Sequence, residues 1–181
     1  MAQSKNDILT HTGIYMDPFI MTPDQVNIYD IAHSLSMMTR ANGHIAHFFS
    51  VAQHCINCTV EARERGCSGR IQLACLLHDA AESYIADVPR PVKHRLAGYA
   101  DLEAYALGVV FDAFGIGELS PEEATSVREI DDAMLYHEFD VLKDVAIGDV
   151  RPALTAVHDF AFHPIEEIES RFLSLFHQLC K

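Results

Sequence analysis

Residues 71–79 read Ile-Gln-Leu-Ala-Cys-Leu-Leu-His-Asp, a run of seven mostly apolar residues that ends in an ionisable pair. A helix that is apolar on nearly every side belongs in the centre of a domain. This stretch therefore predicts a buried central helix, which we expect to continue to Tyr84. An ionised Asp79 in such surroundings is costly unless a partner or a cation neutralises it.

Helical periodicity extends outward from this stretch in both directions. Apolar spacing and stop signals predict further helices over 28–39, 48–65, 102–114, 121–143 and 164–180. Ser120-Pro121-Glu122-Glu123 is a capping box with proline at the first helical position. Residues 1–27 and 144–163 show no period, and we interpret the His-Asp pair at 158–159 as a surface pair without function. The sequence predicts an all-α fold, with an irregular N-terminal arm (1–27) and one helical domain (28–181).

Composition narrows the possible partners. The chain has 181 residues, and its 26 acidic residues against 13 basic ones give a formal net charge of −13. This charge repels polyanions, so it argues against a nucleic-acid duplex or an anionic membrane as a partner. We find no signal-peptide core and no apolar run near the ~20 residues of a membrane span, and we expect a cytoplasmic protein. Five cysteines, an odd number, are expected to be reduced and packed as small apolar residues.

Neighbouring ionisable residues support a functional role for the pair His78-Asp79. Glu82 follows His78 by four residues, which places both on one face of the expected helix. Ionisable groups clustered at the end of an apolar helix are typical of a functional site. The alternative is an internal ion pair with Arg40 or Arg70.

A divalent ion that neutralises this cluster needs further ligands. His54 flanks the apolar stripe of the 48–65 helix, where a hydrogen-bonded core histidine is the alternative. Asp131 shares a helical face with apolar residues, whereas Asp132 lies on a more polar face, so helical geometry selects Asp131 as the inward carboxylate. The resulting set is His54, His78, Asp79 and Asp131. Two imidazoles and two carboxylates suit Mn, Fe, Co or Zn, and suit Mg less well.

The order of these residues resembles the HD-domain metal-dependent phosphohydrolases. The branch with bacterial 5'-deoxynucleotidases and phage-type dATP triphosphohydrolases is similar over segments 30–36, 39–44, 49–54, 76–84, 87–93, 130–135 and 163–173. The spacing His-Asp-x-x-Glu-x-x-x-x-Asp, from 78 to 87, is specific. One position differs, because Ala41 follows Arg40 where this branch usually has an aromatic residue that packs near the sugar or base.

The resemblance implies an HD-domain helical bundle and an enzyme. The implied activity is hydrolysis of the phosphoester of a (deoxy)nucleoside 5'-monophosphate, with triphosphate release from a deoxynucleoside triphosphate as the alternative. The resemblance assigns the four residues above as ligands of one divalent metal ion. It also implies that Arg40 holds the substrate phosphate, while Glu82 and Asp87 serve water activation and leaving-group protonation.

Other basic residues are candidates for substrate contact. Arg90 and Lys93 belong to a short basic run after Asp87, and His33 and His44 flank Arg40. A binuclear site would need more histidines than the single one, at position 94, that lies between the His-Asp pair and Asp131, so we predict one metal. A non-catalytic nucleotide-binding sensor is the alternative of another class, and a homodimer is an expectation by analogy.

Overall fold

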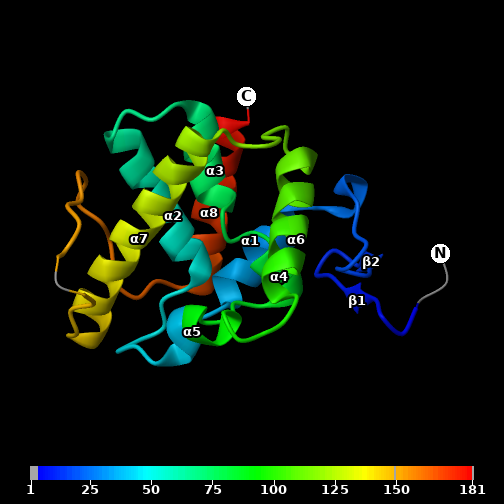
Figure 1. Ribbon diagram of the computed structural model, residues 1–181, viewed down its shortest axis with the longest axis horizontal. Helices are drawn as coiled ribbons and strands as arrows, with labels where there is room; N and C mark the ends of the chain where they lie inside the picture. Colours follow the sequence, from blue (N-terminus) through cyan, green and yellow to red (C-terminus); the bar gives the residue numbers. More distant parts are fainter. Residues whose placement is uncertain (1–3, 149, 181) are drawn as a thin grey trace.

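The computed structural model describes residues 4–148 and 150–180 and is mainly helical (Figure 1). Its helices are α1 (Ile28–Met37), α2 (Val51–Glu64), α3 (Gly69–Leu77), α4 (Glu82–Ile85), α5 (Arg90–Lys93), α6 (Tyr99–Ala113), α7 (Pro121–Lys143) and α8 (Ile165–Leu179). The predicted capping box at Ser120 is present at the start of α7. The prediction of a mainly helical fold is confirmed.

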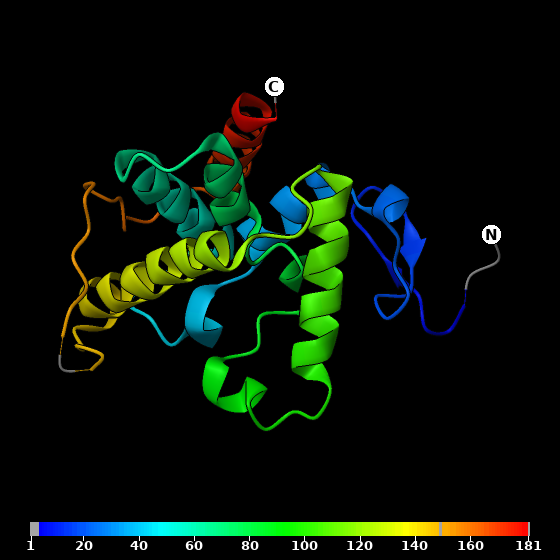
Figure 2. The ribbon, with the colours of Figure 1, turned by 45° about the horizontal axis from the view of Figure 1, so that its top comes forward.

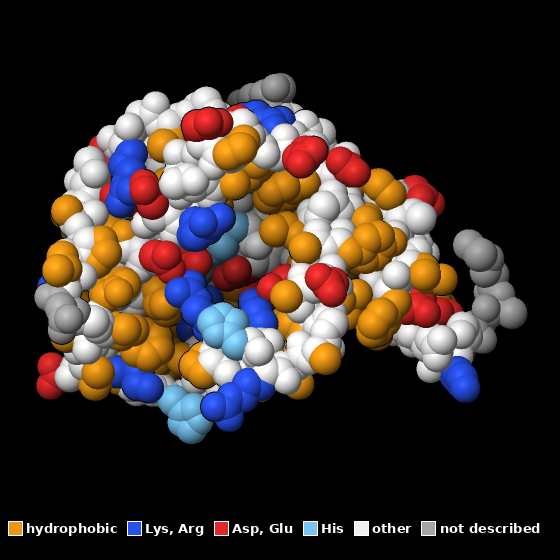
Figure 3. Space-filling view, in the orientation of Figure 1, with side chains coloured by type: hydrophobic (Ala, Val, Ile, Leu, Met, Phe, Trp, Pro, Cys, Tyr) orange, Lys and Arg blue, Asp and Glu red, His pale blue; other side chains and the backbone are white. Residues whose placement is uncertain are grey.

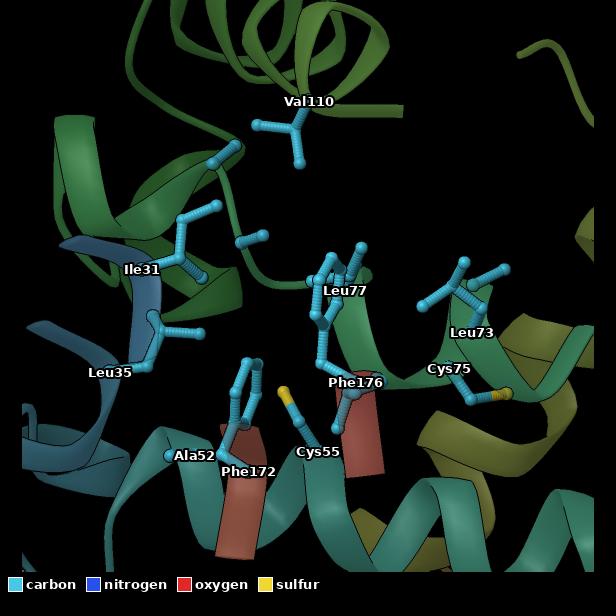
Figure 4. Close-up of a cluster of buried hydrophobic side chains, with 14 of the residues drawn as sticks. Ile31, Leu35, Ala52, Cys55, Leu73, Cys75, Leu77, Val110, Phe172 and Phe176 are labelled. Carbon is cyan, nitrogen blue, oxygen red and sulfur yellow. The ribbon is translucent and has the colours of Figure 1, made fainter. Parts of the chain in front are cut away.

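The central helix is α3, as the sequence predicts. Its segment Leu73–Leu77 is fully or almost fully buried, and α3 packs against α2, α7 and α8. Helix α6 lies between α3 and the N-terminal hairpin, whose strands are β1 (Ile8–Leu9) and β2 (Tyr15–Met16) (Figures 1 and 2). Figure 4 shows part of the hydrophobic core, where side chains of α1, α2, α3, α6 and α8 meet. They are Ile31, Leu35, Ala52, Cys55, Leu73, Leu77, Val110, Phe172 and Phe176. Across 4–148 and 150–180, no helix combines the length and apolar character that a membrane span requires.

The chain leaves the α-helical path directly after Leu77, so the predicted continuation to Tyr84 is wrong. Residues 78–81 form a turn in which backbone bonds run three residues back, from Ala80 N to Leu77 O and from Glu82 N to Asp79 O, each 3.0 Å. The His78 side chain also contributes to the helix end, where its Nδ1 donates a hydrogen bond to a backbone carbonyl in the last turn of α3. This tighter turn separates His78 from Glu82, so the two do not share an α-helical face.

The N-terminal arm contains a small antiparallel sheet, which the expectation of an irregular arm missed. Strand β1 (Ile8–Leu9) pairs with β2 (Tyr15–Met16). Met16 and Met21 are buried in the core. The buried Asp30 of α1 accepts hydrogen bonds from Thr12 N (2.6 Å) and Thr12 Oγ1 (2.8 Å). These contacts fix the arm against the helices.

The segment 144–163 is irregular, as predicted, but His158 is not a surface residue. Its Nε2 donates to the buried Glu61 of α2 (2.9 Å), and the backbone N–H groups of Thr155 and Ala156 donate to the same carboxylate. Burial alone raises the pKa of Glu61, but these bonds and one from Arg65 outweigh it and lower the pKa to about 2. Glu61 therefore ties the loop to α2 as an ionised group.

Replacing Glu61 by Gln is expected to lower the free energy of unfolding by about 1–3 kcal/mol near neutral pH, because the amide cannot accept all of these bonds. The folded pKa lies below the ordinary value of 4.5, so the stabilisation is present above about pH 4.5 and is lost as the pH falls toward 2. Urea unfolding at pH about 7 and about 3 measures this difference. The exposed Glu64→Gln on the same helix is the control, and an equal loss in both variants would contradict the prediction.

Candidate metal centre

The four predicted ligands come together at one point, from α2, the turn after α3, and α7. His54 Nε2 lies 3.2 Å from His78 Nε2 and 3.1 Å from Asp131 Oδ1. Asp79 Oδ1 lies 3.4 Å from His78 Nε2, and Asp79 Oδ2 lies 3.9 Å from His54 Nε2. Two imidazoles and two carboxylates thus face a common space.

Hydrogen bonds on the far side of each ring determine which nitrogen faces this space. His54 Nδ1 lies 2.5 Å from Glu138 Oε1, and His78 Nδ1 lies 2.8 Å from the carbonyl of Cys75. A carboxylate and a carbonyl only accept, so Nδ1 is the donor in both rings. In the neutral form, each ring therefore turns the lone pair of an unprotonated Nε2 toward the other ring. The two lone pairs repel each other unless a cation lies between them.

The electrostatics of this space favour positive charge. Burial alone lowers the pKa of His78, but the charge of Asp79 and the nearby carboxylate of Asp131 raise it well above its usual range. The pKa of His54 is also raised, because Cys58, Glu138 and Asp131 together outweigh burial and the charge of Arg40. The histidines therefore hold a proton readily, and a metal ion that binds there displaces it.

The two shortest distances among these four residues fit a single first-row ion. Adjacent ligands about 2.1 Å from such an ion lie ~3.0 Å apart in octahedral geometry and ~3.4 Å apart in tetrahedral geometry. The contacts from His54 Nε2 to His78 Nε2 and to Asp131 Oδ1, 3.2 and 3.1 Å, lie in this range. Asp131 faces the site, whereas its neighbour Asp132 accepts from Arg90 (2.9 Å), in agreement with the helical-face argument.

Glu138 belongs to the site, and sequence reasoning missed it. It is buried, and its Oε2 accepts from Arg40 Nε and Nη2, each 3.3 Å away, while its Oε1 accepts from His54. The charges of His54 and Arg40 lower the pKa of Glu138 despite its burial. Glu138 lies seven residues after Asp131, two turns along the same face of α7, and this spacing was the available signal.

The alternative of an internal ion pair is realised in part. Arg40 Nη1 donates to Asp79 Oδ2 (3.4 Å), whereas Arg70 pairs with Glu123 on the surface. The closest contact of His78 Nε2 on Asp79 is with the other oxygen, Oδ1. The ion pair with Arg40 thus leaves an oxygen of Asp79 at the histidines.

A cavity of about 540 Å³ opens beside this centre. Figure 3 shows a hollow on the face that carries α5 and α7, with acidic, basic and histidine side chains gathered around it. The predicted catalytic and substrate-binding residues all line the cavity: Arg40, His44, Glu82, Asp87, Arg90 and Lys93. Lys93 also pairs with Glu103. His33 is not in this cavity, because it stacks on His11 at 3.7 Å and pairs with Glu169.

Two carboxyl groups in the cavity have pKa values above their ordinary range. Glu82 is buried, and its Oε2 has no hydrogen-bond partner among the described residues. Burial, together with the negative charges of Asp79 and Asp87, raises the pKa of Glu82 to about 10. Burial also raises the pKa of Asp87. The pair can therefore hold a proton next to the ligand cluster.

Comparisons with known proteins place the chain among relatives. It is 36% identical over 131 residues to the uncharacterized protein YfdR of Escherichia coli K12, covering 72% of this chain and 69% of YfdR. It is 30% identical over 185 aligned residues to the uncharacterized protein RCAP_rcc00048 of Rhodobacter capsulatus, covering 94% and 93% of the two chains. No family model matches the chain. The chain belongs to the protein family that includes YfdR and RCAP_rcc00048.

Proposed function

We propose that the protein is a metal-dependent phosphohydrolase of the HD superfamily that cleaves the phosphoester of a (deoxy)nucleoside 5'-monophosphate. The observation that carries the proposal is that the Nε2 atoms of His54 and His78 lie 3.2 Å apart, next to two carboxylates. In each ring Nδ1 donates a hydrogen bond elsewhere, so Nε2 is free to bind a metal ion. This donor set lies beside a cavity lined by basic residues, where an anionic substrate can be held despite the net charge of −13.

The residues around the cavity have separate tasks in this reaction. A bound divalent cation supplies Lewis acidity where the phosphoryl group reacts. Arg40 presents a guanidinium whose planar fork suits phosphate oxygens, and Glu138 and Asp79 hold it in place. Burial raises the pKa of both Glu82 and Asp87, so one carboxyl can donate a proton to the leaving oxygen while the other accepts one from water.

The opposite wall of the cavity suits an uncharged part of the substrate. Its apolar lining residues come from α7 and from the segments at 45 and 147: Ile45, Leu135, Phe139, Leu142 and Ile147. A cavity of about 540 Å³ has the size of small-molecule sites, which span roughly 300–1,000 Å³. Phe139 supplies an aromatic side chain to this lining, which the small Ala41 also joins.

A hydrolysis screen tests this function. Purified protein loaded with Mn²⁺, Co²⁺, Zn²⁺ or Mg²⁺ is incubated with ribo- and deoxyribonucleoside mono- and triphosphates, and the products are identified. We expect orthophosphate and a nucleoside from a monophosphate, with the highest rate in Mn²⁺. Inorganic triphosphate from a triphosphate would instead support the triphosphohydrolase. Release of neither product by protein with metal bound would contradict the proposal.

A further inference from the structure

A buried thiol of α2 reaches the same ligand cluster. Cys58 follows His54 by four residues, which puts it one helical turn further along the same face. Its Sγ lies 3.6 Å from His54 Nε2, and ligand atoms of Cys58, His54 and His78 all lie within 4.8 Å of one another. Cys58 is 1% exposed, so bulk solvent does not compete for the sulfur.

We propose that Cys58 is a further ligand for borderline or soft divalent ions such as Co²⁺, Zn²⁺ or Cd²⁺, bound as a thiolate together with His54 and His78. This inference rests on the metal centre of the proposed function and adds to it a donor of a different class. On binding, the S–H bond breaks, the sulfur keeps the electron pair and donates it to the ion, and the proton passes to solvent.

The geometry matches a tetrahedral site. Bonds of about 2.1 Å to nitrogen and about 2.3 Å to sulfur, at an angle near 110°, place the two donor atoms ~3.6 Å apart. The observed distance between Cys58 Sγ and His54 Nε2 is 3.6 Å. The two Nε2 atoms, 3.2 Å apart, fit an adjacent pair in the same coordination sphere.

Ligand chemistry makes this contact selective among ions. Thiolates favour Zn²⁺ and softer ions, whereas Mn²⁺ and Mg²⁺ favour carboxylates and water. The centre therefore offers two donor sets around the same histidine pair. A hard ion uses Asp79 and Asp131 and leaves Cys58 a thiol, while a softer ion gains sulfur and gives up a position otherwise open to water or substrate.

Cys55 provides a matched control on the same helix. It is as deeply buried as Cys58 and lies three residues earlier. Its Sγ lies 4.0 Å from His78 Nδ1, the nitrogen that already donates to the Cys75 carbonyl. Ligand atoms of Cys55, His78 and Asp79 also lie within 4.8 Å of one another, so this control tests whether a thiol on the Nδ1 side of the imidazole binds the ion instead.

The experiment is a Co²⁺ titration of the metal-free protein, followed by absorption spectroscopy and by competition with Zn²⁺ and Mn²⁺. Wild type and Cys55→Ser are expected to show a near-ultraviolet thiolate-to-cobalt charge-transfer band together with visible d–d bands. Cys58→Ser and Cys58→Ala are expected to lose the charge-transfer band and keep visible cobalt bands. Their Zn²⁺ affinity falls at least about 10-fold, while their Mn²⁺ affinity is unchanged. Circular dichroism checks that each variant is folded.

The possible failures are distinct. A charge-transfer band that persists in both folded Cys58 variants, or that disappears in Cys55→Ser instead, overturns the thiolate ligand and leaves the metal centre standing. A wild-type protein that shows no cobalt spectrum at all overturns the metal centre, and this inference with it.

Discussion

Replacing Asp131 by Asn is expected to abolish tight binding of a divalent ion and to lower phosphohydrolase activity by at least about 100-fold. Residues that only orient metal ligands typically cost 10–100-fold when they are mutated, so a ligand itself costs at least as much. Asp131 supplies the carboxylate nearest to His54 Nε2, at 3.1 Å, and it also lies 3.7 Å from His78 Nε2. Asn keeps the shape of the side chain and removes the charge that holds a cation there.

The next residue of α7 provides the control. Asp132 has the same side chain on the same helix, but it faces Arg90 outside the cluster. Asp132→Asn is expected to leave Mn²⁺ affinity unchanged in a calorimetric titration at neutral pH. The assignment of Asp131 as a ligand would be wrong if both variants bound Mn²⁺ as tightly as the wild type.

Replacing Glu82 by Gln is expected to reduce turnover by roughly 10²–10⁴-fold, the usual contribution of a general acid or base, while the metal stays bound. The carboxyl is buried and favours its neutral form, so an amide of equal size fits without a new buried charge. Single-turnover hydrolysis of a nucleoside monophosphate, with metal content measured on the same sample, tests this prediction.

The Glu82 variant also separates the two classes of function. An enzyme loses turnover when Glu82 becomes Gln, whereas a nucleotide sensor keeps its binding and has no turnover to lose. The exposed Glu129→Gln on α7 is the control, because it makes the same substitution away from the cavity. Wild-type hydrolysis that Glu82→Gln leaves at full rate would show that this carboxyl is not catalytic.

Local patterns predicted most of the helical framework and the convergence of the four candidate ligands. Asn27 and Ser120 cap α1 and α7 where the first apolar positions and the Ser-Pro-Glu-Glu motif placed those helix starts. The choice of Asp131 over Asp132 needed only the helical period and the nature of each face. These features depend on residues a few positions apart, which a sequence presents directly.

Features that depend on individual side-chain hydrogen bonds were missed. The end of α3 at Leu77 involves a side-chain bond from His78, and a periodic apolar run contains no sign of it. In the sequence, Glu138 is one of many charged residues on a long polar helix. Its role depends on its contacts with His54 of α2 and with Arg40. The side chain of His158 is 1% exposed and donates a hydrogen bond to Glu61, which lies 97 residues earlier in the chain.

The most direct test of the metal centre is an anomalous difference map from crystals of the protein grown with Mn²⁺. A single peak is expected, within about 2.3 Å of the Nε2 atoms of both His54 and His78 and bounded by the carboxylates of Asp79 and Asp131. No peak between the two histidines, or two peaks sharing these ligands, would contradict a centre that holds one divalent ion.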